Sequence, residues 1–153
     1  MNTKPKIIVI NGPNLNLLGT RKQKIYGVQT LVEIEAKCRD EASNLSIALD
    51  FFQSNSEGEI VTKIQQSPDN YQGIIINAAA YSHSSIAILD ALEVLEAADL
   101  PIIEVHLSNI YAREEFRRKS LISSIASGVI CGFGGMGYLL ALKAIAKILH
   151  SRA

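Results

Sequence analysis

Short apolar stretches alternate with helical patterns along the whole of this chain. Five short apolar stretches, most of them enriched in β-branched residues, predict strands, and four are continuous instead of alternating, as in strands buried on both faces. The more mixed stretch at 46–52 is expected at a sheet edge. Strands that alternate with helices form a parallel sheet covered on both faces. The predicted strands lie at 6–10, 46–52, 73–78, 101–107 and 127–133.

The helical patterns have clear start signals. Thr30 with Glu33 and Ser56 with Glu59 match the capping-box pattern, in which a hydroxyl and an acidic side chain satisfy the first backbone N–H groups. Apolar residues recur at helical spacing over 85–98, and 137–149 is a largely apolar helix. Too few strands are present for an eight-stranded barrel. The 153 residues therefore predict a single α/β domain, 1–153, with an open, doubly wound five-stranded sheet.

Composition excludes several classes of partner. The formal net charge is +0, whereas nucleic acids and anionic membranes select a surplus of Lys and Arg. No apolar run reaches the length of a membrane span, and the first strand follows the N-terminus without a signal peptide. The two cysteines, Cys38 and Cys131, are expected as buried thiols in a reducing compartment. A cytoplasmic location is the expectation.

The connection after the first strand is unusually long and polar. It runs from 10 to 27, whereas such connections usually take two to six residues. It carries Asn14, Arg21 and Tyr26 between glycines near its ends. Ligands bind beyond the carboxyl ends of the strands in open α/β sheets, which is where this loop is expected.

The fourth predicted strand carries two polar residues. Side chains alternate along a strand, so Glu104 and His106 should project from the same face. Burying a charge is costly unless it is paired. General acid–base chemistry, with Glu104 orienting His106, is the favoured interpretation. The alternative is a metal site formed by Glu104, His106 and His83, although these residues lack the spacing of known zinc motifs.

Further polar residues are expected at the same rim. Arg113 and Arg117 share a face if 111–118 is helical, although they would otherwise be a solvated charged turn. Asp90, on an otherwise apolar helix, faces either solvent or a partner subunit. The residues collected at the rim are Asn14, Arg21, Tyr26, Asn77, His83, Glu104, His106, Ser108, Arg113 and Arg117.

Several familiar motifs are absent or lack their context. Residues 132–137 spell G-x-G-x-x-G, but no further strand with an acidic residue follows, so we expect close backbone packing instead of a dinucleotide site. The sequence has no serine-nucleophile elbow, no P-loop and no strand-end lysine for a Schiff base. The remaining arginine, tyrosine, histidine and amide groups suit proton transfer on a small polyhydroxylated acid.

Four separated motifs closely resemble the type II 3-dehydroquinate dehydratases, over Ile7 to Leu149. They are NGPNLNLLGTR with IYG, INAAAYSHSS, IEVHLSNIYAREEFRRKS and SGVICGFGGMGYLLAL. The resemblance implies a flavodoxin-like fold, a dodecamer of four trimers, no cofactor and no metal. It also implies a lyase that dehydrates 3-dehydroquinate to 3-dehydroshikimate by anti elimination through an enolate. The reaction belongs to the shikimate pathway of aromatic amino acid biosynthesis or to quinate catabolism.

Matching motif positions imply a role for each residue. Tyr26 would be the base, His106 the general acid, and Arg21 the group that stabilises the tyrosinate. Asn14 would hold the enolate oxygen, and Asp90 would come from a neighbouring subunit. The substrate's hydroxyls and carboxylate would be held by Asn77, His83, Leu107, Ser108 and Arg117, with Arg113 as a further substrate-binding residue and second cation near the base.

The long loop is therefore expected to be a lid, hinged near Gly19 and Gly27, that brings Arg21 beside Tyr26. Ionising a free tyrosine at pH 7 costs roughly 4 kcal/mol, and the attraction of a cation at about 4 Å offsets a comparable amount.

A flavodoxin-type flavin carrier and a non-catalytic binding module remain as alternative functions on the same fold. One departure from the commonest motif is Ala78-Ala79, where Pro-Gly or a Gly pair is usual; it concerns backbone shape near Asn77.

Overall fold

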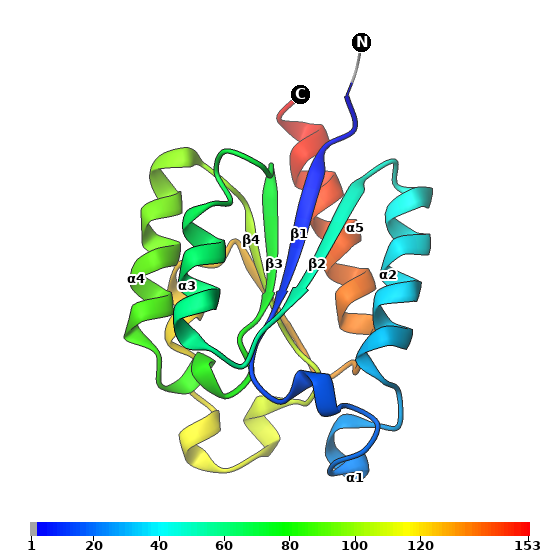
Figure 1. Cartoon of the computed structure of the whole chain (residues 1–153), viewed down its shortest axis with the longest axis vertical. Coiled ribbons are helices and arrows are strands. Elements are labelled where there is room, and N and C mark those ends of the chain that lie inside the picture. The colour runs from blue at the N-terminus through cyan, green and yellow to red at the C-terminus, as the bar shows by residue number, and fades with distance from the viewer. Residues whose placement is uncertain (1–2) are drawn as a thin grey trace.

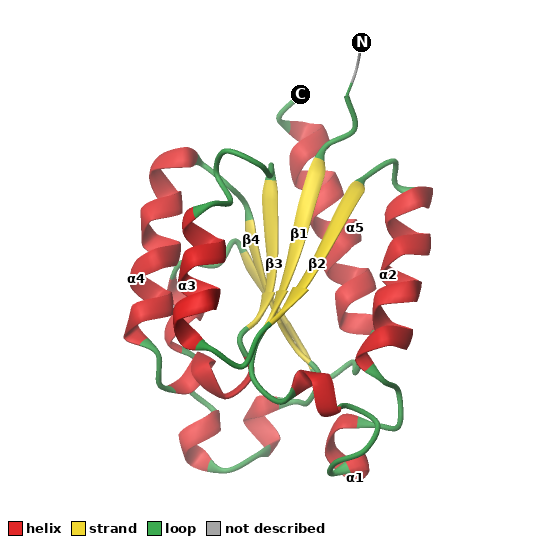
Figure 2. Ribbon diagram, viewed as in Figure 1, coloured by secondary structure: helices red, strands yellow, loops and turns green. Residues whose placement is uncertain are grey.

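The structure, a computed structural model, describes residues 3–153 and is built around one parallel sheet (Figures 1 and 2). The strand order is β2-β1-β3-β4-β5, and every neighbouring pair is parallel. This is the flavodoxin-like, doubly wound order, so the predicted fold class is confirmed. The strands are β1 (Lys6–Asn11), β2 (Ala48–Gln53), β3 (Gly73–Asn77), β4 (Ile102–His106) and β5 (Gly128–Cys131).

Two helices cover each face of the sheet (Figure 1). Helices α2 (Leu31–Asn44) and α5 (Met136–Ser151) bury one core with the odd-numbered side chains of β1, and α3 (Glu57–Gln65) and α4 (Ile86–Val94) bury the other with the even-numbered ones. The alternation of neighbouring β1 side chains between two cores explains why this strand is apolar at successive positions.

The helix starts agree with the sequence signals in most details. Thr30 and Glu33 form both hydrogen bonds of a capping box at α2. Ser56 caps α3 through the Glu59 N–H, but the Glu59 carboxylate accepts from Ser54 instead of completing the box. The helix predicted over 85–98 is α4, followed by the 3-10 helix η3 (Leu95–Ala98).

Strand boundaries and one cysteine differ from expectation. β2 begins two residues later than predicted, because Ser46 adopts a left-handed backbone with φ 56°, but the strand does lie at an edge. Cys38 is buried, and burial raises the pKa of its thiol to about 12. Cys131 is only half-buried, because β5 is the other edge strand.

Over residues 3–153, no helix is both long enough and apolar enough to cross a membrane.

The carboxyl ends of β1 and β3 meet closely. The Gly12 N–H donates to the Asn77 carbonyl at 2.8 Å, and a Cβ at Gly12 would overlap the Ala78 carbonyl. Ala79 follows with φ 52°. The left-handed region costs a non-glycine residue roughly 1–2 kcal/mol. Alanine at position 79, where glycine is usual in this motif, therefore places backbone strain two residues after Asn77.

Ala79→Gly should raise the free energy of unfolding by about 1 kcal/mol, because glycine tolerates positive φ. Ala78→Gly is the matched control: Ala78 is buried with φ −73°, so glycine there should be destabilising. Urea denaturation of both variants measures the difference. A loss of stability in Ala79→Gly would contradict the assignment of strain.

Candidate active site

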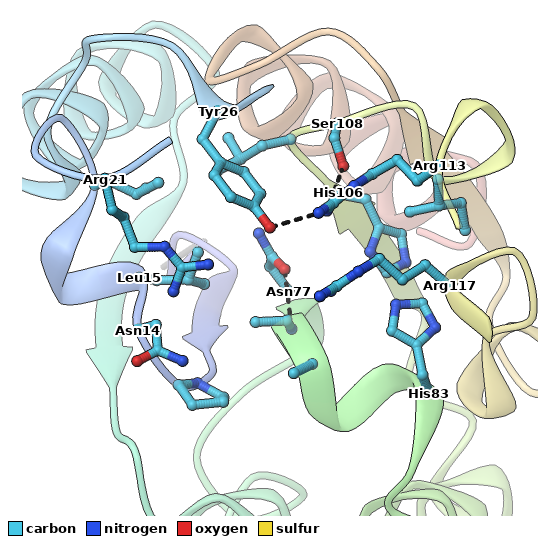
Figure 3. Close-up of a pocket in the computed structure, with 16 residues that line it drawn as sticks. Asn14, Leu15, Arg21, Tyr26, Asn77, His83, His106, Ser108, Arg113 and Arg117 are labelled. Carbon is cyan, nitrogen blue, oxygen red and sulfur yellow. Dashed lines mark hydrogen bonds between the residues drawn. The ribbon is translucent and has the colours of Figure 1, made fainter. Parts of the chain in front are cut away.

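A pocket of about 140 Å³ lies beyond the carboxyl ends of β1, β3 and β4 (Figure 3). Ten predicted site residues line it, whereas Glu104 lies behind His106 and Asp90 does not reach the pocket of its own chain. The ten are Asn14, Arg21, Tyr26, Asn77, His83, His106, Leu107, Ser108, Arg113 and Arg117.

The long loop after β1 folds over the pocket as two short helical turns. These are the 3-10 helix η1 (Leu15–Leu17) and α1 (Gln23–Tyr26). Gly19 and Gly27 bracket α1 with φ 87° and 83°, values that favour glycine. Asn14, with φ 67°, is held by its N–H donating to the Asn55 side chain at 3.0 Å.

Tyr26 lies between two guanidinium groups. Arg113 Nη1 donates to the Tyr26 hydroxyl at 2.9 Å. The Cζ atoms of Arg21 and Arg113 each lie 5.2 Å from the centroid of the Tyr26 ring. The structure thus brings Arg21 beside Tyr26, as the sequence predicted.

Arg113 and Arg117 reach the pocket without a shared α-helix. They belong to a segment of 3-10 turns, η4 (Ile110–Ala112) and η5 (Glu115–Arg117), so the α-helix on which the predicted shared face depended is not formed. Glu114 lies 2.9 Å from Arg117 Nε and 3.8 Å from Arg113 Nε. Arg113 Nη2 is buried and has no hydrogen-bond partner among the described residues. A guanidinium with an open donor in a pocket is suited to an anionic ligand.

His106 and Glu104 form a buried pair on one face of β4, as predicted. His106 Nε2 is hydrogen-bonded to Glu104, which also accepts from Ser120 Oγ at 2.6 Å and from Ser123 Oγ. Burial by itself would raise the pKa of Glu104, but the hydrogen bonds from His106, Ser120 and Ser123 outweigh it and lower the pKa. Glu104 is therefore an ionised carboxylate bonded to Nε2 of His106, and Nδ1 is the other ring nitrogen.

His83 completes this side of the pocket. Its ring stacks on His106 with centroids 6.2 Å apart. Because the Lys119 carbonyl can only accept, His83 Nδ1 must donate to it, at 2.8 Å. Residues 3–153 contain no group of three or more His, Cys, Asp or Glu side chains placed to hold a metal ion, so the alternative metal site is not formed.

Some functional neighbours were missed from sequence. Ser120 and Ser123 support Glu104, and Asn55 supports Asn14, but serines and asparagines in irregular segments show no periodic signal. Leu15, Leu18 and Ile110 form an apolar part of the pocket wall. Three arginines and no acidic residue line the pocket. It is therefore suited to a small anion that also presents hydroxyl groups.

The glycine-rich turn at 132–137 is a packing feature, as expected. A Cβ at Gly137 would lie 3.3 Å from Val105 Cγ1, and a Cβ at Gly135 would overlap the Gln29 side chain. The turn lets the start of α5 approach β4 closely.

Comparison with known proteins agrees with this geometry. The family model described as "Dehydroquinase class II" matches residues 5–146. The chain is 54% identical over 142 residues to a 3-dehydroquinate dehydratase of Brucella canis, covering 93% of this chain and 88% of that protein.

Solved structures show the same relationship. A type II dehydroquinase from Propionibacterium acnes superposes with a TM-score of 0.88 at 41% identity, covering 96% of this chain and 99% of the other. One from Butyrivibrio crossotus gives 0.90 at 41% identity, covering 94% and 99%. With a family model, curated relatives and solved structures all in agreement over most of its length, the chain belongs to the dehydroquinase class II family.

Proposed function

We propose that this chain dehydrates 3-dehydroquinate to 3-dehydroshikimate by anti elimination, with Tyr26 as the base and His106 as the general acid. One observation carries the proposal. A phenol held among cations and an imidazole held against a carboxylate line the same pocket, so one group is prepared to accept a proton and the other to donate one. Family membership supplies the substrate.

The base half begins with Tyr26 as a phenolate. It removes a proton from the carbon beside the substrate ketone, and the electron pair of the broken C–H bond moves into the enolate. Arg113, predicted to bind substrate, donates to the phenol oxygen, so we assign it to the base as well. A cation about 4 Å away contributes around 4 kcal/mol at an effective dielectric near 20. Asn14, at the pocket wall, would hold the enolate oxygen through a water molecule.

The acid half ends with loss of water. The enolate electrons form the new C=C bond while the C–O bond breaks, and His106 transfers its proton to the departing hydroxyl. Glu104 stabilises the imidazolium before this transfer. Afterwards Tyr26 carries a proton and His106 lacks one, so proton transfer through solvent restores both.

The remaining pocket residues would hold the substrate. Arg117, His83, Asn77 and Ser108 present donors to a carboxylate and hydroxyls, together with the backbone at Leu107. The loop between Gly19 and Gly27 already holds Tyr26 at Arg113, and its closure over a bound substrate would exclude water. A binding module would need no phenol among cations, and the family match is to dehydratases instead of flavin carriers.

One face of α4 has the features of a contact between subunits. Ile86, Asp90 and Val94 lie one turn apart on one face, and Ile86 and Val94 are 64% and 66% exposed. An exposed apolar stripe around one carboxylate is typical of an interface. We propose that Asp90 reaches the pocket of a neighbour in a trimer, and that four trimers form a dodecamer. The enzyme would act in the cytoplasm, in aromatic biosynthesis or in quinate breakdown.

Tyr26→Phe removes the proton acceptor and keeps the ring, so kcat should fall at least about 10²-fold. The unfolding temperature should stay near that of the parent. The product is a conjugated enone, so its ultraviolet absorbance measures turnover. Tyr111→Phe, at an exposed tyrosine outside the pocket, is the control and should keep parental kcat. Near-parental turnover in Tyr26→Phe would place the base elsewhere.

Glu104→Gln should lower kcat roughly 10- to 10²-fold, because His106 loses its counter-ion. Its effect on stability should depend on pH. Since the folded pKa of Glu104 lies below its ordinary value of 4.5, the carboxylate stabilises the fold fully above about pH 4.5 and less as pH falls through the folded pKa. The stability difference from the parent should therefore shrink on acidification.

Urea titrations at several pH values test this dependence. Glu35→Gln, which removes an exposed ion pair with Arg39, is the control and should change stability little at any pH. A pH-independent deficit in Glu104→Gln would show that the residue contributes shape and not charge.

Asp90→Ala should raise KM without lowering the unfolding temperature, because the side chain is exposed and serves another subunit's pocket. Mixed oligomers of Asp90→Ala and Tyr26→Phe subunits should regain activity, since an intact pocket then receives an intact Asp90. Asp69→Ala, at another exposed position, is the control. A fully active monomer in light scattering, or no recovery on mixing, would contradict the shared site.

A further inference from the structure

A buried chain of hydrogen bonds crosses the sheet behind the pocket. The Ala79 N–H donates to Asn77 Oδ1 at 3.1 Å, and Asn77 Nδ2 donates to the Tyr138 hydroxyl at 2.9 Å. Tyr138 donates to Asn11 Oδ1 at 2.6 Å, and Asn11 Nδ2 donates to the Phe52 carbonyl at 3.2 Å. Tyr138 and Asn11 are fully buried, and neither lines the pocket.

The two ends of this chain determine its direction. The backbone N–H of Ala79 can only donate, so it requires the carbonyl oxygen of Asn77. The backbone carbonyl of Phe52 can only accept, so it requires the amide nitrogen of Asn11. Tyr138 must therefore accept from Asn77 and donate to Asn11. Burial also raises the pKa of Tyr138, which keeps its hydroxyl proton in place.

This direction leaves Asn77 with one free polar group. Its carbonyl oxygen and one amide hydrogen are engaged, and the second Nδ2 hydrogen is available at the pocket wall, where Asn77 lies among the labelled side chains (Figure 3). We infer that Tyr138 is a positioning residue that holds Asn77 as a hydrogen-bond donor to an oxygen of the substrate. The inference rests on the proposed function, because it concerns the binding of 3-dehydroquinate.

Tyr138 reaches this position because α5 begins close to the sheet. Gly137, the residue before it, lies against Val105 of β4, where a Cβ would be 3.3 Å from Val105 Cγ1. Asn11 and Asn77 are register partners at the ends of β1 and β3. One hydroxyl on α5 can therefore bridge both amides.

Tyr138→Phe should raise KM about 3- to 10-fold, the effect expected for one misplaced hydrogen bond, and should change kcat less than twofold. Tyr71→Phe is the matched control. It also removes a buried phenol hydroxyl, bonded to Asp50 at 2.6 Å, but Tyr71 lies at the opposite end of β3. Its unfolding temperature should fall while its KM stays parental.

A double-mutant cycle separates positioning from general loss of structure. If Tyr138 acts through Asn77, Tyr138→Phe should leave KM unchanged in an Asn77→Ala background. Parental KM in Tyr138→Phe, or an equal increase in the Asn77→Ala background, would overturn the inference. An increase in Tyr71→Phe of the same size would do so as well.

If Tyr138→Phe does not fold, Asn11→Ala tests the same chain one bond further from the pocket. Asn11 touches no substrate, so a rise of about 2-fold in KM must pass through Tyr138. Parental KM there would also overturn the inference. A parent chain that does not dehydrate 3-dehydroquinate would instead refute the proposed function, which distinguishes the two failures.

Discussion

The pairing of β1 with β3 at their carboxyl ends is the constraint on which the site depends. The chain goes outward from β1 to β2 and returns to β3, so the loops after β1 and β3 leave the sheet side by side. The Gly12–Asn77 backbone hydrogen bond extends this pairing one residue beyond the strands. A crevice at the switch in strand order is where open α/β sheets bind ligands. The long loop after β1, Asn77 and His83 all start from this point.

The two groups proposed for proton transfer lie in opposite electrostatic environments. Tyr26 lies beside the guanidinium groups of Arg21 and Arg113. His106 is held against the ionised carboxylate of Glu104. The carboxylate can remain ionised inside the sheet because two hydroxyls and the imidazole all donate to it. Without these donors, a buried glutamate would take up a proton instead.

Fold and motif content were largely predictable from sequence. Continuous apolar stretches identified the five strands, and hydroxyl caps identified the starts of the helices between them, because both signals depend on local spacing. The Glu104–His106 pair was predictable because strand alternation is strict. The sequence did not predict the start of β2 after Ser46 or the 3-10 turns in the segment of Arg113 and Arg117. Both depend on contacts distant in sequence.

The sequence by itself determined the α/β class, the long polar loop after β1, the pairing of Glu104 with His106 on one strand face and the family motifs. Only the tertiary structure decided which arginine touches the phenol, which serines hold Glu104 and how Tyr138 joins Asn11 to Asn77. These contacts join residues 16 to 127 positions apart. No local pattern encodes such distances, because each contact exists only when the sheet has placed its strands and helices side by side.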